Sequence, residues 1–171
     1  MRKLFALYDR LTQPIFPFAQ SAFLLAIRLY WGWQLTQTGW GKLHHLANVT
    51  EYFQGLGVPM AAFNARFVGG LELVGGILLV LGLANRLSAV PLTINFIVAY
   101  WFGDHDALLA IFKDPGTFYG AAPFTFLFVS AVVLLFGPGL FSIDALIRRV
   151  LTGKNAIRAA DKEFSARRVA V

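Results

Sequence analysis

The chain of 171 residues contains no cysteine. It can therefore form no disulfide, offers no thiolate nucleophile, and has no ligands for an iron–sulfur cluster or a covalently attached haem. Charge is scarce as well, because charged residues make up 14% of the chain and apolar residues 57%. This composition is typical of a membrane protein and speaks against a soluble enzyme. No redox cofactor intrinsic to the chain is expected.

Long apolar runs predict an all-α membrane domain with four spans. About 20 apolar residues suffice to cross a bilayer, and the runs that qualify cover residues 16–38, 61–83, 87–102 and 121–136. Asn85 and Arg86 separate the second run from the third, and the sequence Gly137-Pro138-Gly139 cannot continue a helix. We expect an N-terminal segment (1–15), a four-helix bundle (16–144) and a basic tail (145–171).

The positions of lysine and arginine predict the orientation of the bundle. Most basic residues outside the spans fall at the N-terminus, in the turn between the second and third spans, and in the tail: Arg2, Lys3, Arg10, Arg86, Arg148, Arg149, Lys154, Arg158, Lys162, Arg167 and Arg168. The two longer loops hold only Lys42, Arg66 and Lys113. Basic segments remain cytoplasmic, so both termini are expected there. The net charge of +6 then faces anionic lipid, and no nucleic-acid partner is needed to explain it.

Three polar side chains interrupt the apolar spans at matching depths. Counted from the cytoplasmic ends, Arg28, Glu72 and Asn95 each lie roughly 14–17 Å into the membrane. A lone charge near the bilayer centre costs roughly 2.5–3.5 kcal/mol. We therefore expect Arg28 and Glu72 to form an ion pair, with Asn95 satisfying a remaining donor or acceptor. Such a pair can be a structural staple or can handle a ligand or a proton, and the sequence does not separate these roles.

The spacing of glycines predicts which helix faces meet. Gly69 and Gly76 lie on the same side of the second span as Glu72, where small residues allow a neighbouring backbone to come close. One face of the first span carries a similar series, namely Arg28, Gly32, Gly39 and Lys42. Glu72 is therefore expected to point into the bundle and not toward lipid.

Taken in order, these residues resemble a known family. The matching pattern consists of Arg28-x3-Gly32-x6-Gly39-x2-Lys42-Leu43, Gly57-x-Pro59, Glu72-Leu-Val-Gly75-Gly76 leading to Gly82, and Gly137-Pro-Gly139-x2-Ser142-Ile-Asp144. It resembles the DoxX family of small bacterial membrane proteins over residues 22–147. The resemblance implies a four-helix bundle in the bacterial inner membrane, and the pattern positions that carry over are Arg28, Lys42 and Glu72. Some relatives are associated with thiosulfate:quinone oxidoreductase or with oxidative-stress complexes.

The resemblance and the polar layer together suggest a subunit of a membrane oxidoreductase or oxidative-stress complex. In this hypothesis the subunit is non-catalytic or contacts quinone in a cleft lined by Arg28, Trp31, Lys42 and Glu72. A cation would donate to a quinone oxygen, and the acid could exchange a proton. Two alternatives stay open: a scaffold that recruits a partner protein through the basic tail, and a small-molecule carrier with Arg28 and Lys42 as attracting cations. A homo-oligomer is also left open.

Histidines and acids near the outer ends of the spans form a second candidate site. The group comprises His44, His45, Asp104, His105 and Asp106. Imidazole and carboxylate ligands suit Zn, Mn or Fe. No recognised ligand spacing occurs among these residues, and loop histidines are usually solvated, so no metal site is expected. The predicted spans contain no histidine to ligate haem.

Two amphipathic segments flank the spans. Residues 46–60, with Tyr52 and Phe53, are expected to form a short interfacial helix and turn over the outer mouth of the bundle. Residues 145–151 alternate apolar and basic side chains and are expected to lie on the inner leaflet.

Overall fold

The computed structural model describes residues 15–153, and in this part of the chain helices and turns form all of the regular structure, with no strand. The prediction of an all-α protein is thus confirmed. The long helices are α2 (Ile15–His44), α4 (Ala61–Leu81), α5 (Asn85–Gly103) and α8 (Phe124–Phe136). The short ones are α3 (Leu46–Gly55), α6 (His105–Leu109), the 3₁₀-helix η1 (Ala110–Phe112) and α7 (Pro115–Gly120). A further helical stretch covers residues 143–153, so the structure describes residues 145–153 of the predicted tail, whereas residues 1–14 and 154–171 lie outside the described part.

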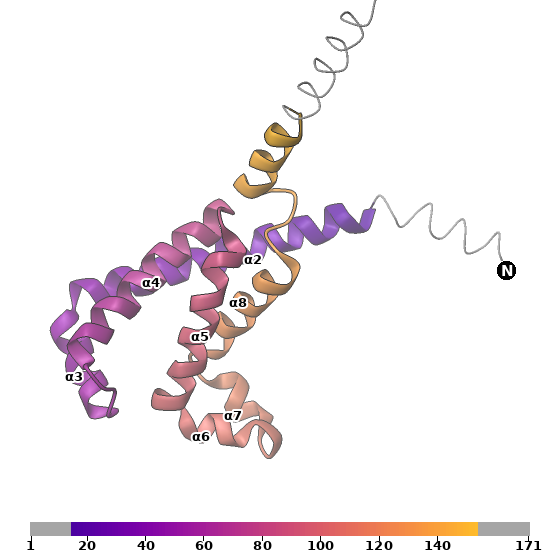
Figure 1. Ribbon diagram of the computed structural model, residues 1–171. Helices are drawn as coiled ribbons and strands as arrows, with labels where there is room; N and C mark the ends of the chain where they lie inside the picture. The colour runs from indigo at the N-terminus through magenta and orange to yellow at the C-terminus, as the bar shows by residue number, and fades with distance from the viewer. Residues whose placement is uncertain (1–14, 154–171) are drawn as a thin grey trace, which may run out of the picture.

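Helices α2 and α4 form a tightly packed antiparallel pair (Figure 1). A Cβ atom added to Gly39 would lie 2.3 Å from the backbone nitrogen of Leu73, and one added to Gly76 would lie 2.6 Å from that of Thr36. Both positions therefore require glycine for the backbones to approach this closely. The predicted glycine-lined contact between the first two spans is confirmed.

Helices α5 and α8 form the second pair. The rings of Phe96 and Phe126 stack with their centroids 5.3 Å apart, and a core of buried apolar residues continues along the pair through Leu92, Val129 and Val133. Leu92 also fills the space beside Gly75 of α4, where an added Cβ would lie 2.9 Å from the leucine side chain. The glycine on α4 thus allows the two pairs to join.

The two pairs meet at one end and diverge at the other (Figure 1). The end at which they meet, here called the turn end, contains residues 82–84 between α4 and α5. The opposite end, here called the open end, carries α3 on the first pair and α6 and α7 on the second.

At this end Thr117 donates a hydrogen bond of 2.7 Å to Asp114, which lowers the pKa of that exposed carboxyl group.

Apolar side chains cover much of the outer surface. Within residues 15–153, α4 is the one helix that is both long and apolar enough to cross a membrane, and only 33% of its apolar window is buried. Helix α8 is strongly apolar but shorter. Exposed large side chains such as Phe67, Ile94 and Phe128 extend this surface over the other helices. A soluble protein would bury such a helix, so the outward apolar surface suits a lipid environment.

Candidate ligand-binding cavity

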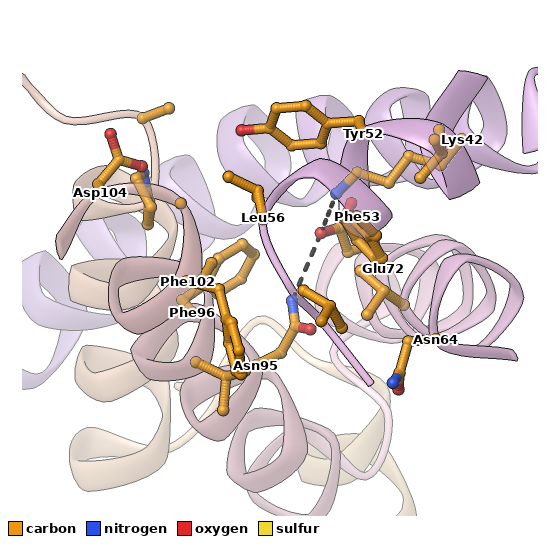
Figure 2. A pocket seen from close by; sticks show the side chains of 18 of the residues that line it. Lys42, Tyr52, Phe53, Leu56, Asn64, Glu72, Asn95, Phe96, Phe102 and Asp104 are labelled. Atoms are coloured by element: carbon orange, nitrogen blue, oxygen red, sulfur yellow. Dashed lines mark hydrogen bonds and ion pairs between the residues drawn. The ribbon is translucent and has the colours of Figure 1, made fainter. Parts of the chain in front are cut away.

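A cavity of about 670 Å³ lies between the two helix pairs toward the open end. Its lining comes from the C-terminal part of α2, from α3, from the middle of α4, and from α5 and the start of α8. Figure 2 shows the side chains that surround it. Cavities of a few hundred to about 1,000 Å³ are typical of small-molecule sites. The divergence of the two pairs therefore creates a space that can hold a ligand.

The walls of the cavity are mainly apolar and aromatic. Phe53 projects from α3, Phe96 and Phe102 from α5, and Phe126 from α8. Tyr52 and Asp104 add polar groups nearer the open end. Sequence reasoning expected residues 46–60 to cover the mouth of the bundle, and α3 does contribute to this wall. The aromatic residues of α5 and α8 were missed, because their apolar pattern equally predicts a packed helix face.

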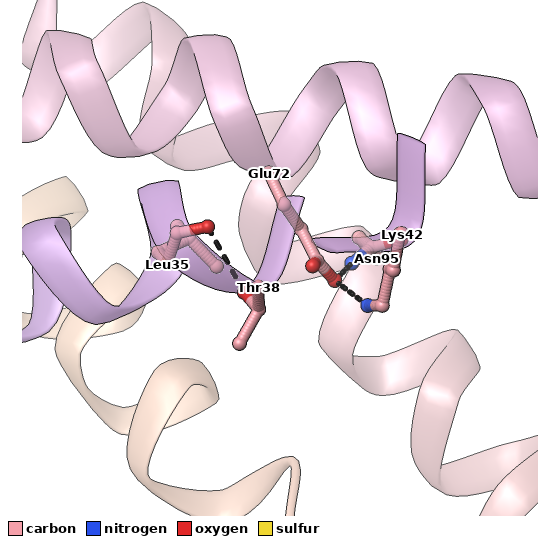
Figure 3. Close-up of polar contacts among 5 residues, drawn as sticks. All are labelled: Leu35, Thr38, Lys42, Glu72 and Asn95. Atoms are coloured by element: carbon pink, nitrogen blue, oxygen red, sulfur yellow. Dashed lines mark hydrogen bonds and ion pairs between the residues drawn. The ribbon is translucent and has the colours of Figure 1, made fainter. Parts of the chain in front are cut away.

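Three polar side chains, here called the polar cluster, form one region of the lining: Lys42, Glu72 and Asn95. The ammonium of Lys42 lies 2.5 Å from Oε1 of Glu72, and Nδ2 of Asn95 donates to the same oxygen at 3.4 Å (Figure 3). The Glu72 side chain is 2% exposed, whereas that of Lys42 is 31% exposed. Three helices thus converge on one buried carboxylate, and Asn95 contacts Glu72 although Lys42 stands where Arg28 was expected.

The second carboxylate oxygen of Glu72 differs sharply from the first. Oε2 is buried and accepts no hydrogen bond from any residue in the described part of the chain. The nearby hydroxyl of Thr38 is not available as a donor, because it donates to the carbonyl of Leu35 at 2.9 Å. A buried acceptor without a partner costs about 1–3 kcal/mol. The polar cluster therefore has unused acceptor capacity beside the cavity.

The predicted ion pair between Arg28 and Glu72 is wrong. Arg28 is fully buried, but Nη2 donates to the carbonyl of Phe141 at 2.6 Å and Nε donates to that of Leu24 at 3.3 Å. In the amide orientation that satisfies both groups, Asn85 accepts from Nη1 of Arg28 at 3.1 Å. The partner of Glu72 is instead Lys42.

The register of α2 against α4 explains the error. Depths measured from the start of each apolar run put Arg28 level with Glu72, but α2 extends past α4 at the turn end (Figure 1). A Cβ on Gly82 would lie 2.1 Å from Nη1 of Arg28, which places Arg28 level with the end of α4. Arg28 and Lys42 are about 21 Å apart along the helix. Arg28 therefore lies at the turn end of the helix pair, and Lys42 lies at the level of the middle of α4.

Arg28 belongs to a separate network at the turn end. Residues 137–144 fold back against the turn between α4 and α5, where Oδ1 of Asp144 accepts from the backbone of Ala84 at 2.9 Å and Oδ2 accepts from that of Asn85 at 3.2 Å. Gly82 has φ +71°, a conformation that favours glycine. The loop of residues 137–144, which follows the fourth predicted span, is therefore held against α2 and the turn after α4.

The remaining candidates do not join the cavity site. Trp31 packs against the apolar core and does not line the cavity. Within residues 15–153, no group of three or more histidine, aspartate or glutamate side chains is placed to hold a metal ion. His44 and His45 instead contact backbone carbonyls one turn earlier in α2, at 2.9 and 3.0 Å. Asp104 is the one residue of that group which lines the cavity.

A helical protein with an apolar outer surface and a polar cluster beside a ligand-sized cavity belongs to the class of helical membrane proteins with a cavity that can hold a ligand. A family model, DoxX, matches residues 23–105, a stretch that contains the whole polar cluster. The chain belongs to the DoxX family, and the resemblance found from the sequence is confirmed.

Two curated relatives are similar over most of their length. One is an uncharacterized membrane protein of Mycobacterium tuberculosis, 32% identical over 115 residues, which are 61% of this chain and 68% of the relative. The other is an uncharacterized protein of Haemophilus influenzae, 27% identical over 139 residues, which are 79% of this chain and 89% of the relative. No solved structure gives a significant match. The family and the relative named as a membrane protein agree with the outward apolar surface in placing this chain in a bilayer.

Proposed function

We propose that this protein is a non-catalytic, quinone-contacting subunit of a membrane oxidoreductase or oxidative-stress complex. The observation that carries the proposal is the cavity of about 670 Å³, which is apolar on most sides and polar at the cluster of Lys42, Glu72 and Asn95. A ligand for such a space has an apolar body and one polar head. Isoprenoid quinones have this form and dissolve in the bilayer itself.

The polar cluster suits a quinone head. The Lys42 ammonium uses one of its three hydrogens on Glu72, and the lysine side chain is 31% exposed, so two donors remain for a ligand carbonyl. The rings of Phe53, Phe96 and Phe102 offer flat apolar surfaces for the ring and the start of its tail. When bound, a quinone supplies the electron chemistry. This chain's own residues bind and orient the head, and Glu72 is placed to exchange a proton with it.

The proposal includes a topology and a location. We place α2, α4, α5 and α8 as four spans in a bacterial inner membrane, with both termini in the cytoplasm. The excess of basic residues in the terminal segments and at Arg86 supports this orientation. The turn end then faces the cytoplasm and the cavity lies toward the outer side. Helix α8 has 13 residues, about 20 Å, and so would reach across only part of the hydrocarbon core.

Electron transfer requires a partner protein in this proposal, because a chain without cysteine supplies no iron–sulfur cluster. A scaffold role for the turn-end network is compatible with the proposal, since Arg28 and Asp144 hold the start of the C-terminal segment in place. Such a role would concern recruitment of the partner and would not involve the cavity.

Direct titration tests the binding function. The purified chain in lipid nanodiscs is titrated with decylubiquinone and followed by calorimetry, and saturable binding is expected. Ala99→Phe and Val68→Phe fill the cavity from opposite walls and are expected to weaken binding at least tenfold. Ala47→Phe adds the same bulk to an exposed site on α3 outside the lining and serves as the control.

The outcomes are distinct. Binding lost in both cavity variants and kept in Ala47→Phe supports the proposal, provided that thermal unfolding shows all three variants to be folded. Absence of saturable binding to the unsubstituted chain, or equal affinity in all variants, overturns it.

A further inference from the structure

The unused acceptor of Glu72 carries an inference about ligand chemistry that rests on the binding function proposed above. Oε1 accepts from both Lys42 and Asn95, whereas Oε2 accepts from no described residue although the side chain is 98% buried from solvent. Glu72 is the acidic partner of Lys42 in an ion pair. A carboxylate has only acceptor sites, so what it lacks is a donor.

In the structure no side chain of the described residues donates a hydrogen bond to Oε2. Thr38 is committed to the carbonyl of Leu35, and the amide of Asn95 already donates to Oε1. The other charged group in the lining, Asp104, is an acid and would repel a carboxylate rather than satisfy it. Because Glu72 lines the cavity, a molecule bound there can supply this donor.

We infer that the cavity selects a ligand whose polar head donates a hydrogen bond from a hydroxyl group. For the proposed quinone-class ligand this means the reduced form: a quinol carries two hydroxyl donors, while the oxidised quinone has only carbonyl acceptors. The hydroxyl donates to the Glu72 carboxylate, and the hydroxyl oxygen can accept from the Lys42 ammonium. A single hydroxyl thus complements both charged members of the polar cluster.

A matched pair of redox-inert probes tests this selection. Para-decylphenol and its methyl ether, para-decylanisole, share a ring and an apolar tail and differ in the single hydroxyl hydrogen and the methyl group that replaces it. With the unsubstituted protein in lipid nanodiscs, the phenol is expected to bind at least about tenfold more tightly, because the ether leaves the buried acceptor without a donor. Equal affinities, as expected if water satisfies Oε2, overturn the inference.

Substitution of Glu72 sharpens the test. In Glu72→Gln the amide oxygen stays with the two existing donors and the NH₂ group turns to the open side, so the preference for the phenol should fall to parity or below. Glu51→Gln makes the same chemical change on the exposed face of α3 and should keep the preference. A phenol preference retained in Glu72→Gln assigns it to another group and overturns the inference.

The two proposals fail in different ways. If neither probe binds and decylubiquinone does not bind either, the binding function itself is wrong; if decylubiquinone alone binds, only the preference for a hydroxyl donor is wrong. If both bind with equal affinity and are displaced by decylubiquinone, the cavity holds quinone-class ligands but does not distinguish a hydroxyl donor. The comparison of the two probes on the unsubstituted chain remains decisive even if Glu72→Gln does not fold.

Discussion

The ammonium of Lys42, from the last turns of α2, lies 2.5 Å from Oε1 of Glu72 in the middle of α4. The contact joins a partly exposed cation to a buried anion at the cavity. Lys42 can therefore neutralise Glu72 and still face a ligand. A fully enclosed pair would hold the helices together but would leave no charged group to recognise a ligand head.

Removal of the cation should destabilise the helix pair. In Lys42→Met the carboxylate of Glu72 stays buried without its partner, at an expected cost of about 1–3 kcal/mol in the free energy of unfolding, since Lys42 is partly exposed. The double variant Lys42→Met with Glu72→Gln removes the uncompensated charge and should recover at least half of the loss. The measurement is unfolding by denaturant in detergent micelles.

Lys113→Met provides the matched control, because Lys113 is exposed and lies in the segment between η1 and α7. Its stability should equal that of the parent chain. If the double variant were less stable than Lys42→Met alone, the contact between Lys42 and Glu72 would not be the source of the effect.

The sequence predicted the helices well but placed one charge at the wrong depth. Apolar runs identified α4 and α5 to within about two residues at each end, because this signal is local, whereas α2 continues to His44, six residues beyond the predicted span. The partner of Glu72 depends on how far α2 slides along α4, which a run of apolar residues does not record. The glycine spacing indicates the correct partner. Gly39 and Gly69 mark a close approach of α2 and α4. Lys42 and Glu72 each follow one of these glycines by three residues, so both lie beside that contact.

The glycine contact itself can be tested with a pair of alanine substitutions. Gly39→Ala would place its Cβ 2.3 Å from the backbone of Leu73, so the helices must separate, at an expected cost of about 1–3 kcal/mol. Gly70→Ala meets nothing within 4 Å and should be neutral or stabilise the helix by up to about 1 kcal/mol. Thermal unfolding of both variants checks the contrast. Similar midpoints for the two would contradict the close packing of α2 and α4.

Arg28 should matter for stability and not for ligand affinity. Arg28→Met leaves the carbonyl of Phe141 without its buried donor, and a hydrogen bond from a charged group is worth about 1.5–3 kcal/mol. Arg66→Met is the control, because Arg66 is exposed and donates a hydrogen bond of 3.1 Å to the carbonyl of Ala62 in its own helix. In calorimetry the folded Arg28→Met protein should bind decylubiquinone within about twofold of the parent affinity. A loss of affinity comparable to that of the cavity-filling variants would show that Arg28 contributes to ligand binding.

The absence of cysteine makes the proposed topology directly measurable, because each introduced thiol is unique. Glu51→Cys on α3 and Thr152→Cys in the C-terminal helical stretch are both exposed and lie beyond opposite ends of the helix pairs. A membrane-impermeant maleimide applied to spheroplasts should label Glu51→Cys at once and Thr152→Cys only after lysis. Ile94→Cys, at a site that is 57% exposed on the apolar surface of α5, should resist labelling in both conditions, because a thiol in hydrocarbon does not ionise. Labelling of Thr152→Cys in intact spheroplasts would show that the proposed orientation is wrong. Rapid labelling of Ile94→Cys would show that this face of α5 does not lie in the hydrocarbon core.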